Sequence, residues 1–211
     1  MTSLVKSSPL RLKAIDEAGV FEGYGSVFNV VDDVRDVVVP GAFAASLARH
    51  GAEGTRPKGL WQHRWDCPIL TWSEMREDAR GLRVRGQLLL DIQQAREAHA
   101  LMRAGELDGL SIGFECSDIE YARPDEFEQK FGFGLAPAPY AMQPGEKVRV
   151  LKGIDLWEVS LVTFPACRPA RVETVKAGMP AHDRAALAAA LARRQLAMAG
   201  IVGRHAIQSR Q

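Results

Sequence analysis

Hydrophobic and polar residues alternate with period two along much of the chain, and this pattern predicts a protein built mainly from strands. The alternating runs cover residues 10–15, 20–28, 36–39, 59–62, 68–75, 81–90, 109–115, 147–151 and 154–162. Turn-forming residues separate the runs, and residues 16–19, between the first two, are typical of a hairpin. Many short strands with few helices predict a β-rich α+β fold with a closed or partly open β-barrel of about seven strands.

Helical periodicity occurs in only a few places, so the predicted helices are few and peripheral. The clearest covers residues 91–104, where Asp91 is the predicted N-cap and Gly105 is the residue that ends the helix. Residues 42–49 also have helical composition. The glycine- and proline-rich stretch 50–58 that follows them is predicted to be a loop.

The composition of the chain changes near residue 176. The sequence before this point is acidic and rich in strand patterns, whereas the sequence after it is basic and rich in alanine. We therefore predict a β-barrel domain over residues 1–176 and a basic helical tail over residues 177–211. Within the domain, the proline- and glycine-punctuated stretch 122–146 is predicted to be a long mobile loop.

The charge and the cysteine content limit the expected binding partners and the expected cellular compartment. The net charge of +1 gives no general attraction to nucleic acid or to a membrane surface. Cys67, Cys116 and Cys167 form no CxxC pair, which favours a reducing compartment. The sequence shows neither the apolar run of a signal peptide nor the ~20 apolar residues of a membrane span. We therefore expect a cytosolic protein that binds neither nucleic acid nor membrane.

The strand predicted over residues 109–115 carries a candidate nucleophile. Alternation directs its three large apolar residues toward the core and places Ser111 and Gly113 on the opposite face. A glycine inside a strand often marks the close approach of another backbone. This arrangement fits a hydroxyl that faces a peptide substrate, and it also fits an ordinary surface serine.

Two further residues supply the other parts of an acyl-transfer triad. His63 follows a short predicted strand and could act as a general base toward Ser111. Glu158 shares the face of its strand with apolar residues, so its carboxylate needs a hydrogen-bond donor, and an imidazole N–H would serve. The alternatives are a histidine that ends a strand and a glutamate that reaches water at an edge.

No pattern in the sequence predicts a metal or a cofactor. His63, Asp66, Cys67 and Glu74 lie close together in the chain but form no HExxH, CxxC or calcium-loop motif. The phosphate-binding motifs of nucleotide sites are also absent from the sequence. We therefore expect neither a cofactor nor a metal site.

Several longer motifs carry a resemblance to a known family. They are GYGSVFN, VVVPGAF, LWQH ending at His63, GLRVRGQL, AREAHALMRAGELDGLSIGF containing Ser111, and IDLWEVSLVTFPACRPARV containing Glu158. They occur in the family's order and spacing, and the resemblance covers roughly residues 10–175. The chain resembles the tailed-phage prohead (procapsid maturation) serine proteases, which are related to the herpesvirus assemblin proteases.

The resemblance implies a serine endopeptidase with Ser111 as nucleophile, His63 as general base and Glu158 as the third member of the triad. In the herpesvirus relatives this third member is a second histidine. The implied substrates and partners are the scaffold protein and the major capsid protein, and then the protease itself. The implied location is the host bacterial cytoplasm, inside the procapsid. The resemblance also allows for a homodimer.

Two other functions remain open at this point. The first is an inactive barrel-fold protein that acts as a capsid assembly or scaffold factor. The second is a metal-dependent hydrolase that uses His63, Asp66 and Glu158. Sensitivity to a chelator would separate the second from a serine protease.

Overall fold

The computed structural model describes residues 17–136, 142–143 and 145–174. The chain divides into two units, Met1–Ala177 and Gly178–Gln211, and all of the described residues belong to the first unit. The predicted strand over residues 10–15 and the predicted helical tail over residues 177–211 lie outside the described residues.

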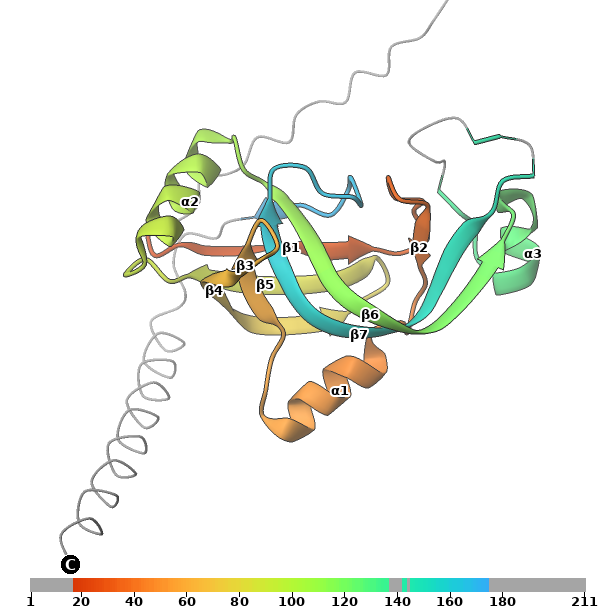
Figure 1. The fold of residues 1–211 in the computed structure, drawn as a ribbon, viewed down its shortest axis with the longest axis horizontal. Helices are drawn as coiled ribbons and strands as arrows, with labels where there is room; N and C mark the ends of the chain where they lie inside the picture. Colours follow the sequence, from red (N-terminus) through yellow and green to blue (C-terminus); the bar gives the residue numbers. More distant parts are fainter. Residues whose placement is uncertain (1–16, 137–141, 144, 175–211) are drawn as a thin grey trace, which may run out of the picture. The chain divides into compact units, whose positions relative to one another are not determined.

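Strands dominate the described part of the chain, as the alternating pattern predicted, and three α-helices accompany them (Figure 1). The strands are β1 (Val20–Val27), β2 (Asp36–Val38), β3 (Lys58–Trp61), β4 (Arg64–Glu77), β5 (Gly81–Leu88), β6 (Gly109–Ala122), β7 (Val148–Val162) and β8 (Val172–Thr174). They form one eight-stranded sheet in the order β2-β7-β3-β4-β5-β1-β8, with β6 also paired to β7. The predicted β-rich α+β class is confirmed, with eight strands in the sheet.

The sheet curls into a partly closed barrel (Figure 1). An isolated bridge joins Gly109, at the start of β6, to Arg171, which directly precedes β8. The backbone N–H of Leu110 donates to the carbonyl of Ala170 over 2.9 Å, and the N–H of Val172 donates to the carbonyl of Asp108 over 2.9 Å. These bonds bring the start of β6 against the far edge of the same sheet.

β7 is the central strand of this arrangement. Along one side it pairs antiparallel with β6, and along the other it pairs parallel with β2 and then with β3. The sequence predicted two strands, 147–151 and 154–162, but the structure contains one. Its pairing with β6 shifts register around Gly153, so the apparent break is a bulge within a continuous strand.

The first two helices differ from the predictions at their ends. α1 (Ala44–Glu53) extends into the first four residues of the predicted loop over residues 50–58, so that His50 is helical, and its C-cap is Gly54 in the left-handed conformation. α2 (Gln93–Ala104) ends at Gly105 as predicted, but its N-cap is the extended Ile92 and not Asp91. The Ile92 N–H is bonded to the carbonyl of Leu89, so a tight turn rather than a side-chain cap starts this helix.

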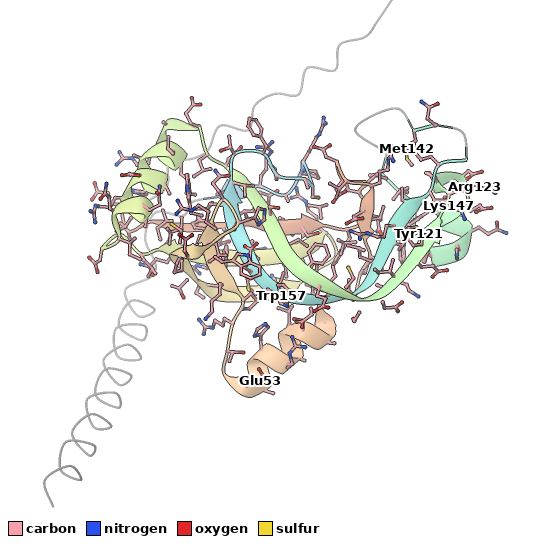
Figure 2. All side chains as sticks on the ribbon, in the orientation of Figure 1. Glu53, Tyr121, Arg123, Met142, Lys147 and Trp157 are labelled. Carbon is pink, nitrogen blue, oxygen red and sulfur yellow. The ribbon has the colours of Figure 1, made fainter. Side chains whose placement is uncertain are left out.

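Residues 122–131, the first part of the predicted mobile loop over residues 122–146, lie almost entirely in regular secondary structure. β6 extends to Ala122, a 3-10 turn covers Pro124–Glu126, and α3 (Phe127–Phe131) follows. Phe127 is fully buried in a second, smaller core that includes Val148 and Val150 of β7. Residues 124–131 thus form helical turns within a segment that its prolines and glycines marked as a loop, because Phe127 packs into this core. Figure 2 shows Tyr121, Arg123 and Lys147 gathered at this end of β6 and β7.

Candidate active site

Three neighbouring strands bring the predicted site residues together. β7 lies between β3 and β6, so β3, β7 and β6 follow one another across the sheet. Ser111 of β6 lies opposite Ser160 of β7, and Gly113 lies opposite Glu158. Directly paired residues project from the same face of a sheet. His63 follows β3 and reaches over this face.

The side chains of Ser111, His63 and Glu158 form a continuous chain of hydrogen bonds. His63 Nε2 lies 3.0 Å from Ser111 Oγ, and His63 Nδ1 lies 2.6 Å from Glu158 Oε1. In the tautomer that satisfies both contacts, Nδ1–H donates to the carboxylate and Nε2 accepts the serine hydroxyl proton. This arrangement has the geometry that a general base needs toward a hydroxyl nucleophile.

A tight turn between β3 and β4 holds the imidazole in place. Trp61 pairs with Arg64, and both intervening residues, Gln62 and His63, have positive φ values of 50° and 57°. Two successive residues of this kind are typical of a type I′ hairpin turn, which is unusual for residues other than Gly, Asn or Asp. The turn is tied to the end of β7 by a bond from Gln62 N–H to the carbonyl of Leu161. Backbone strain of this kind often occurs at functional sites.

The carboxylate of Glu158 is buried, with 4% of the residue exposed, whereas the side chain of His63 is 43% exposed. The hydroxyl of Ser160 donates to Glu158 Oε2 over 2.7 Å and accepts the backbone N–H of His63 over 3.1 Å. The sequence alone did not indicate any role for Ser160. Strand alternation put it on the same face as Glu158, but only the fold brings the backbone of His63 to its other side.

Gly113 makes room for the carboxylate. A Cβ atom at this position would overlap Glu158 Oε1 and lie against Glu158 Cγ and Cδ. The sequence indicated that something approaches Gly113 closely, and suggested a substrate backbone. The neighbour is instead a side chain of the site itself.

A cavity of about 260 Å³ adjoins Ser111. Its wall includes Ile112 and Phe114 of β6, and its charged groups are Asp32, Asp36 and Arg149. The Arg149 guanidinium binds the Asp36 carboxylate through two bonds of 2.7 and 2.5 Å. Burial raises the pKa of Asp32 to about 6. The space is large enough to take a side chain of a bound peptide.

Exposed aromatic side chains lie close in sequence to His63 and Glu158. Trp65 is 78% exposed, and its ring meets that of Trp157 edge to face, with 6.2 Å between the centroids. Figure 2 shows Trp157 on the side of the sheet where α1 lies. Phe164, which follows β7, is 90% exposed. Exposed aromatic groups near a candidate site are candidates for contact with a partner chain.

Of the residues considered for a metal site, His63 and Glu158 lie together, but their contact is not part of a larger cluster of possible ligands in the described ranges. Within the described ranges, no cluster of three or more His, Cys, Asp or Glu side chains could hold a metal ion. The carboxylate of Asp66 pairs with Arg64 at 3.0 Å, and both side chains are exposed. None of the helices that the structure describes is long and apolar enough to cross a membrane.

Comparison with known proteins identifies the family. A family model described as caudovirus prohead serine protease matches residues 8–185. The prohead protease of Enterobacteria phage HK97 is 34% identical over 161 residues, which are 75% of this chain and 60% of that protein. The capsid polyprotein of Pseudomonas phage PAJU2 is 30% identical over 188 residues, which are 85% of this chain and 23% of that protein.

The chain thus spans only part of the length of each of these two relatives. The match to the family model, in contrast, covers most of the chain and includes Ser111, His63 and Glu158. The resemblance seen in the sequence motifs is therefore confirmed: the chain belongs to the caudovirus prohead serine protease family.

Proposed function

We propose that this chain is a serine endopeptidase of capsid maturation, with Ser111 as nucleophile, His63 as general base and Glu158 as the group that orients the imidazole. The observation that carries the proposal is the hydrogen-bonded chain from Ser111 Oγ through both ring nitrogens of His63 to the buried carboxylate. Membership of a serine protease family supports the same roles.

The proposed reaction is hydrolysis of a peptide bond in two steps. Ser111 Oγ attacks the scissile carbonyl carbon while His63 Nε2 takes the hydroxyl proton. When the C–N bond breaks, His63 returns that proton to the leaving amine, and the acyl group stays on Ser111. Water then attacks the ester in the same way, which releases the acid and restores the hydroxyl. Glu158 stabilises the imidazolium that forms in both steps.

The proposed substrates are the major capsid protein and the scaffold protein, cut inside the assembling procapsid in the cytoplasm of the bacterial host. The names of the relatives, a prohead protease and a capsid polyprotein, support a capsid protein as substrate. Packing of the substrate around the enzyme would give a high effective concentration, so a slow enzyme would suffice.

We further propose that residues 1–176 form the protease domain and that residues 177–211 are a removable tail that targets the enzyme to the procapsid. Self-cleavage near residues 176–180 would then release it. The abrupt change to basic, alanine-rich composition supports this division. Intact mass of the wild-type chain should show loss of the tail with time, while the Ser111→Ala chain stays at full length.

Co-expression with the capsid protein tests the central proposal. The wild-type chain should shorten the capsid protein, and Ser111→Ala should abolish the cleavage. Ser117→Ala is a matched control, because Ser117 is an exposed serine of the same strand. If Ser111→Ala still cuts, Ser111 is not the nucleophile. If neither the wild-type chain nor the control cuts, the chain is better described as an inactive assembly factor.

A chelator separates the serine mechanism from the metal-dependent alternative. Because the proposed mechanism uses only side chains of the protein, EDTA should leave the rate of capsid-protein cleavage unchanged. Loss of cleavage in EDTA, with recovery on adding zinc, would instead favour a hydrolase that uses His63, Asp66 and Glu158.

A further inference from the structure

A buried hydroxyl beside the proposed triad has no role in the proposed reaction. Ser160 of β7 is fully buried. It donates its proton to Glu158 Oε2 over 2.7 Å and accepts the backbone N–H of His63 over 3.1 Å. One hydroxyl thus bonds to two of the three proposed triad members, to the side-chain carboxylate of Glu158 and to the backbone N–H of His63.

We propose that Ser160 is a positioning residue that holds Glu158 and His63 in register with Ser111. The proposal rests on the proposed protease function. By binding Oε2, the hydroxyl leaves Oε1 directed at the Nδ1–H of His63, 2.6 Å away. By accepting the N–H of His63, it also fixes the strained turn that carries the imidazole.

The register of the sheet makes Ser160 suited to this task. It lies directly opposite Ser111 in the β6–β7 pair and opposite Leu60 in the β3–β7 pair. The nucleophile, the orienting carboxylate and the turn of the base are therefore tied to one short segment of β7. A displacement of this segment moves all three groups together.

The donor and acceptor capacities of the hydroxyl are both used, so alanine cannot replace it. Ser160→Ala leaves a carboxylate oxygen and a backbone N–H without their partner in a buried place, where unpaired polar groups are costly. The carboxylate of Glu158 and the backbone N–H of His63 can regain hydrogen-bond partners only by moving. Because a displacement of about 1 Å can reduce a rate about 100-fold, the loss should appear in the chemical step.

The first test is kinetic and uses the full chain with a peptide from the capsid cleavage site. Ser160→Ala should lower kcat about 10- to 100-fold while KM changes less than about twofold. Ser46→Ala is the matched control, because Ser46 is also buried and its hydroxyl accepts the backbone N–H of Leu156 on β7, away from the triad. It should leave kcat unchanged. An equal loss of kcat in both variants would mean that loss of any buried serine hydroxyl bonded to β7 has this effect, and would overturn the proposal.

The second test asks whether Ser160 acts through Glu158. The effects of Ser160→Ala and Glu158→Ala on kcat should be strongly non-additive, because the second change removes the group that the first one misplaces. The double variant should be only slightly slower than Glu158→Ala alone. If the two losses multiply, Ser160 does not act through the carboxylate and the proposal fails.

The third test does not require protease activity, so its outcome is separate from that of the proposed function. A proton in a short imidazole–carboxylate hydrogen bond resonates far downfield in NMR spectra. In the Ser111→Ala chain, which should not digest itself, His63 Nδ1–H should give such a signal. Adding Ser160→Ala should shift it upfield or broaden it, whereas adding Ser46→Ala should not. An unchanged signal in the Ser160→Ala chain would overturn the proposal even if the enzyme proves active.

Discussion

The carboxylate of Glu158 occupies the space that a side chain at position 113 would need. Gly113→Ala should therefore leave the fold intact, because a side-chain end can move aside, but should draw the carboxylate away from His63. We expect a loss of at least about 10-fold in kcat, and a decrease of about 1–3 kcal/mol in unfolding free energy because the buried carboxylate loses its bond to His63. Kinetics and thermal unfolding of the same preparation would check this.

Gly51→Ala is the control for that variant. Gly51 lies inside α1, and a Cβ atom there would meet nothing within 4 Å. Alanine should stabilise the helix by roughly 0.5–1 kcal/mol without any effect on kcat. If Gly113→Ala is as active as Gly51→Ala, the position of the carboxylate does not limit the reaction.

Substitutions of the three proposed triad members should reduce kcat by different factors. His63→Ala should reduce kcat about as strongly as Ser111→Ala, since base and nucleophile act as a unit. Glu158→Gln keeps the shape of the side chain but loses the charge that stabilises the imidazolium. We therefore expect its loss of kcat to be roughly 10- to 100-fold smaller than that of Ser111→Ala or His63→Ala. Single-turnover rates on a capsid peptide would rank the three variants. A Glu158→Gln chain with the wild-type rate would remove Glu158 from the mechanism.

At the residue scale, the sequence identified chemistry but not contacts. Ser111, His63 and Glu158 could be singled out because each chemical type fits one part of a known reaction. The roles of Ser160 and Gly113 could not be found, since they depend on which residue of β6 lies opposite which residue of β7. Alternation gives the face of a strand, but it does not give the register between two strands.

At the scale of elements, the N-terminus of helix α1 is capped by a side chain from strand β4. Its N-cap residue, Phe43, has no side-chain cap bond of its own. The carboxylate of Glu77, at the end of β4, instead accepts the backbone N–H groups of Gly41 and Phe43 over 3.0 and 2.8 Å. This contact both caps the helix and fixes it to the sheet.

Glu77→Ala should consequently lower the unfolding free energy by about 1–2 kcal/mol, the usual cost of a lost helix cap. Cleavage activity below the unfolding transition should not change, because α1 does not touch Ser111 or His63 in any described contact. Chemical denaturation would measure the effect. Glu53→Ala, at the exposed far end of α1, should change stability by less than about 0.5 kcal/mol.

Element types were predicted better than element ends. The strand patterns were strong because half-buried strands alternate cleanly, and they placed most of the sheet. The sequence puts the end of α1 too early because Gly51 suggests a loop, although the left-handed residue that ends the helix is Gly54. The fold of residues 124–131 could not be predicted, since it depends on the packing of Phe127 against β7, which is distant in the sequence.

At the scale of the whole molecule, stability should depend on pH through Asp32. Burial raises the pKa of this carboxyl from 3.8 to about 6, so the folded chain holds the proton more tightly than the unfolded chain. Ionisation of Asp32 therefore costs stability, and this cost appears as the pH rises from about 4 to 6 and is complete above that range.

Asp32→Asn should remove this cost. Its amide oxygen can still accept the N–H groups of Val34 and Asp36 that Asp32 Oδ1 accepts. The variant should match the wild type in thermal stability near pH 4 and exceed it at pH 8. Asp125→Asn, at a carboxylate whose side chain is 75% exposed, should show no such pH-dependent gain. A constant difference between Asp32→Asn and the wild type across this pH range would contradict the assignment.

The central place of β7 has a consequence for the nascent protein. β2, β3 and β6 all pair with β7, yet this strand begins only at Val148, after all three have been synthesised. On the ribosome, the serine and the histidine emerge long before the strand that aligns them, and such distant pairing forms late. The nascent chain should therefore be unable to cut its neighbours on the same polysome, and translation itself would delay the onset of proteolysis.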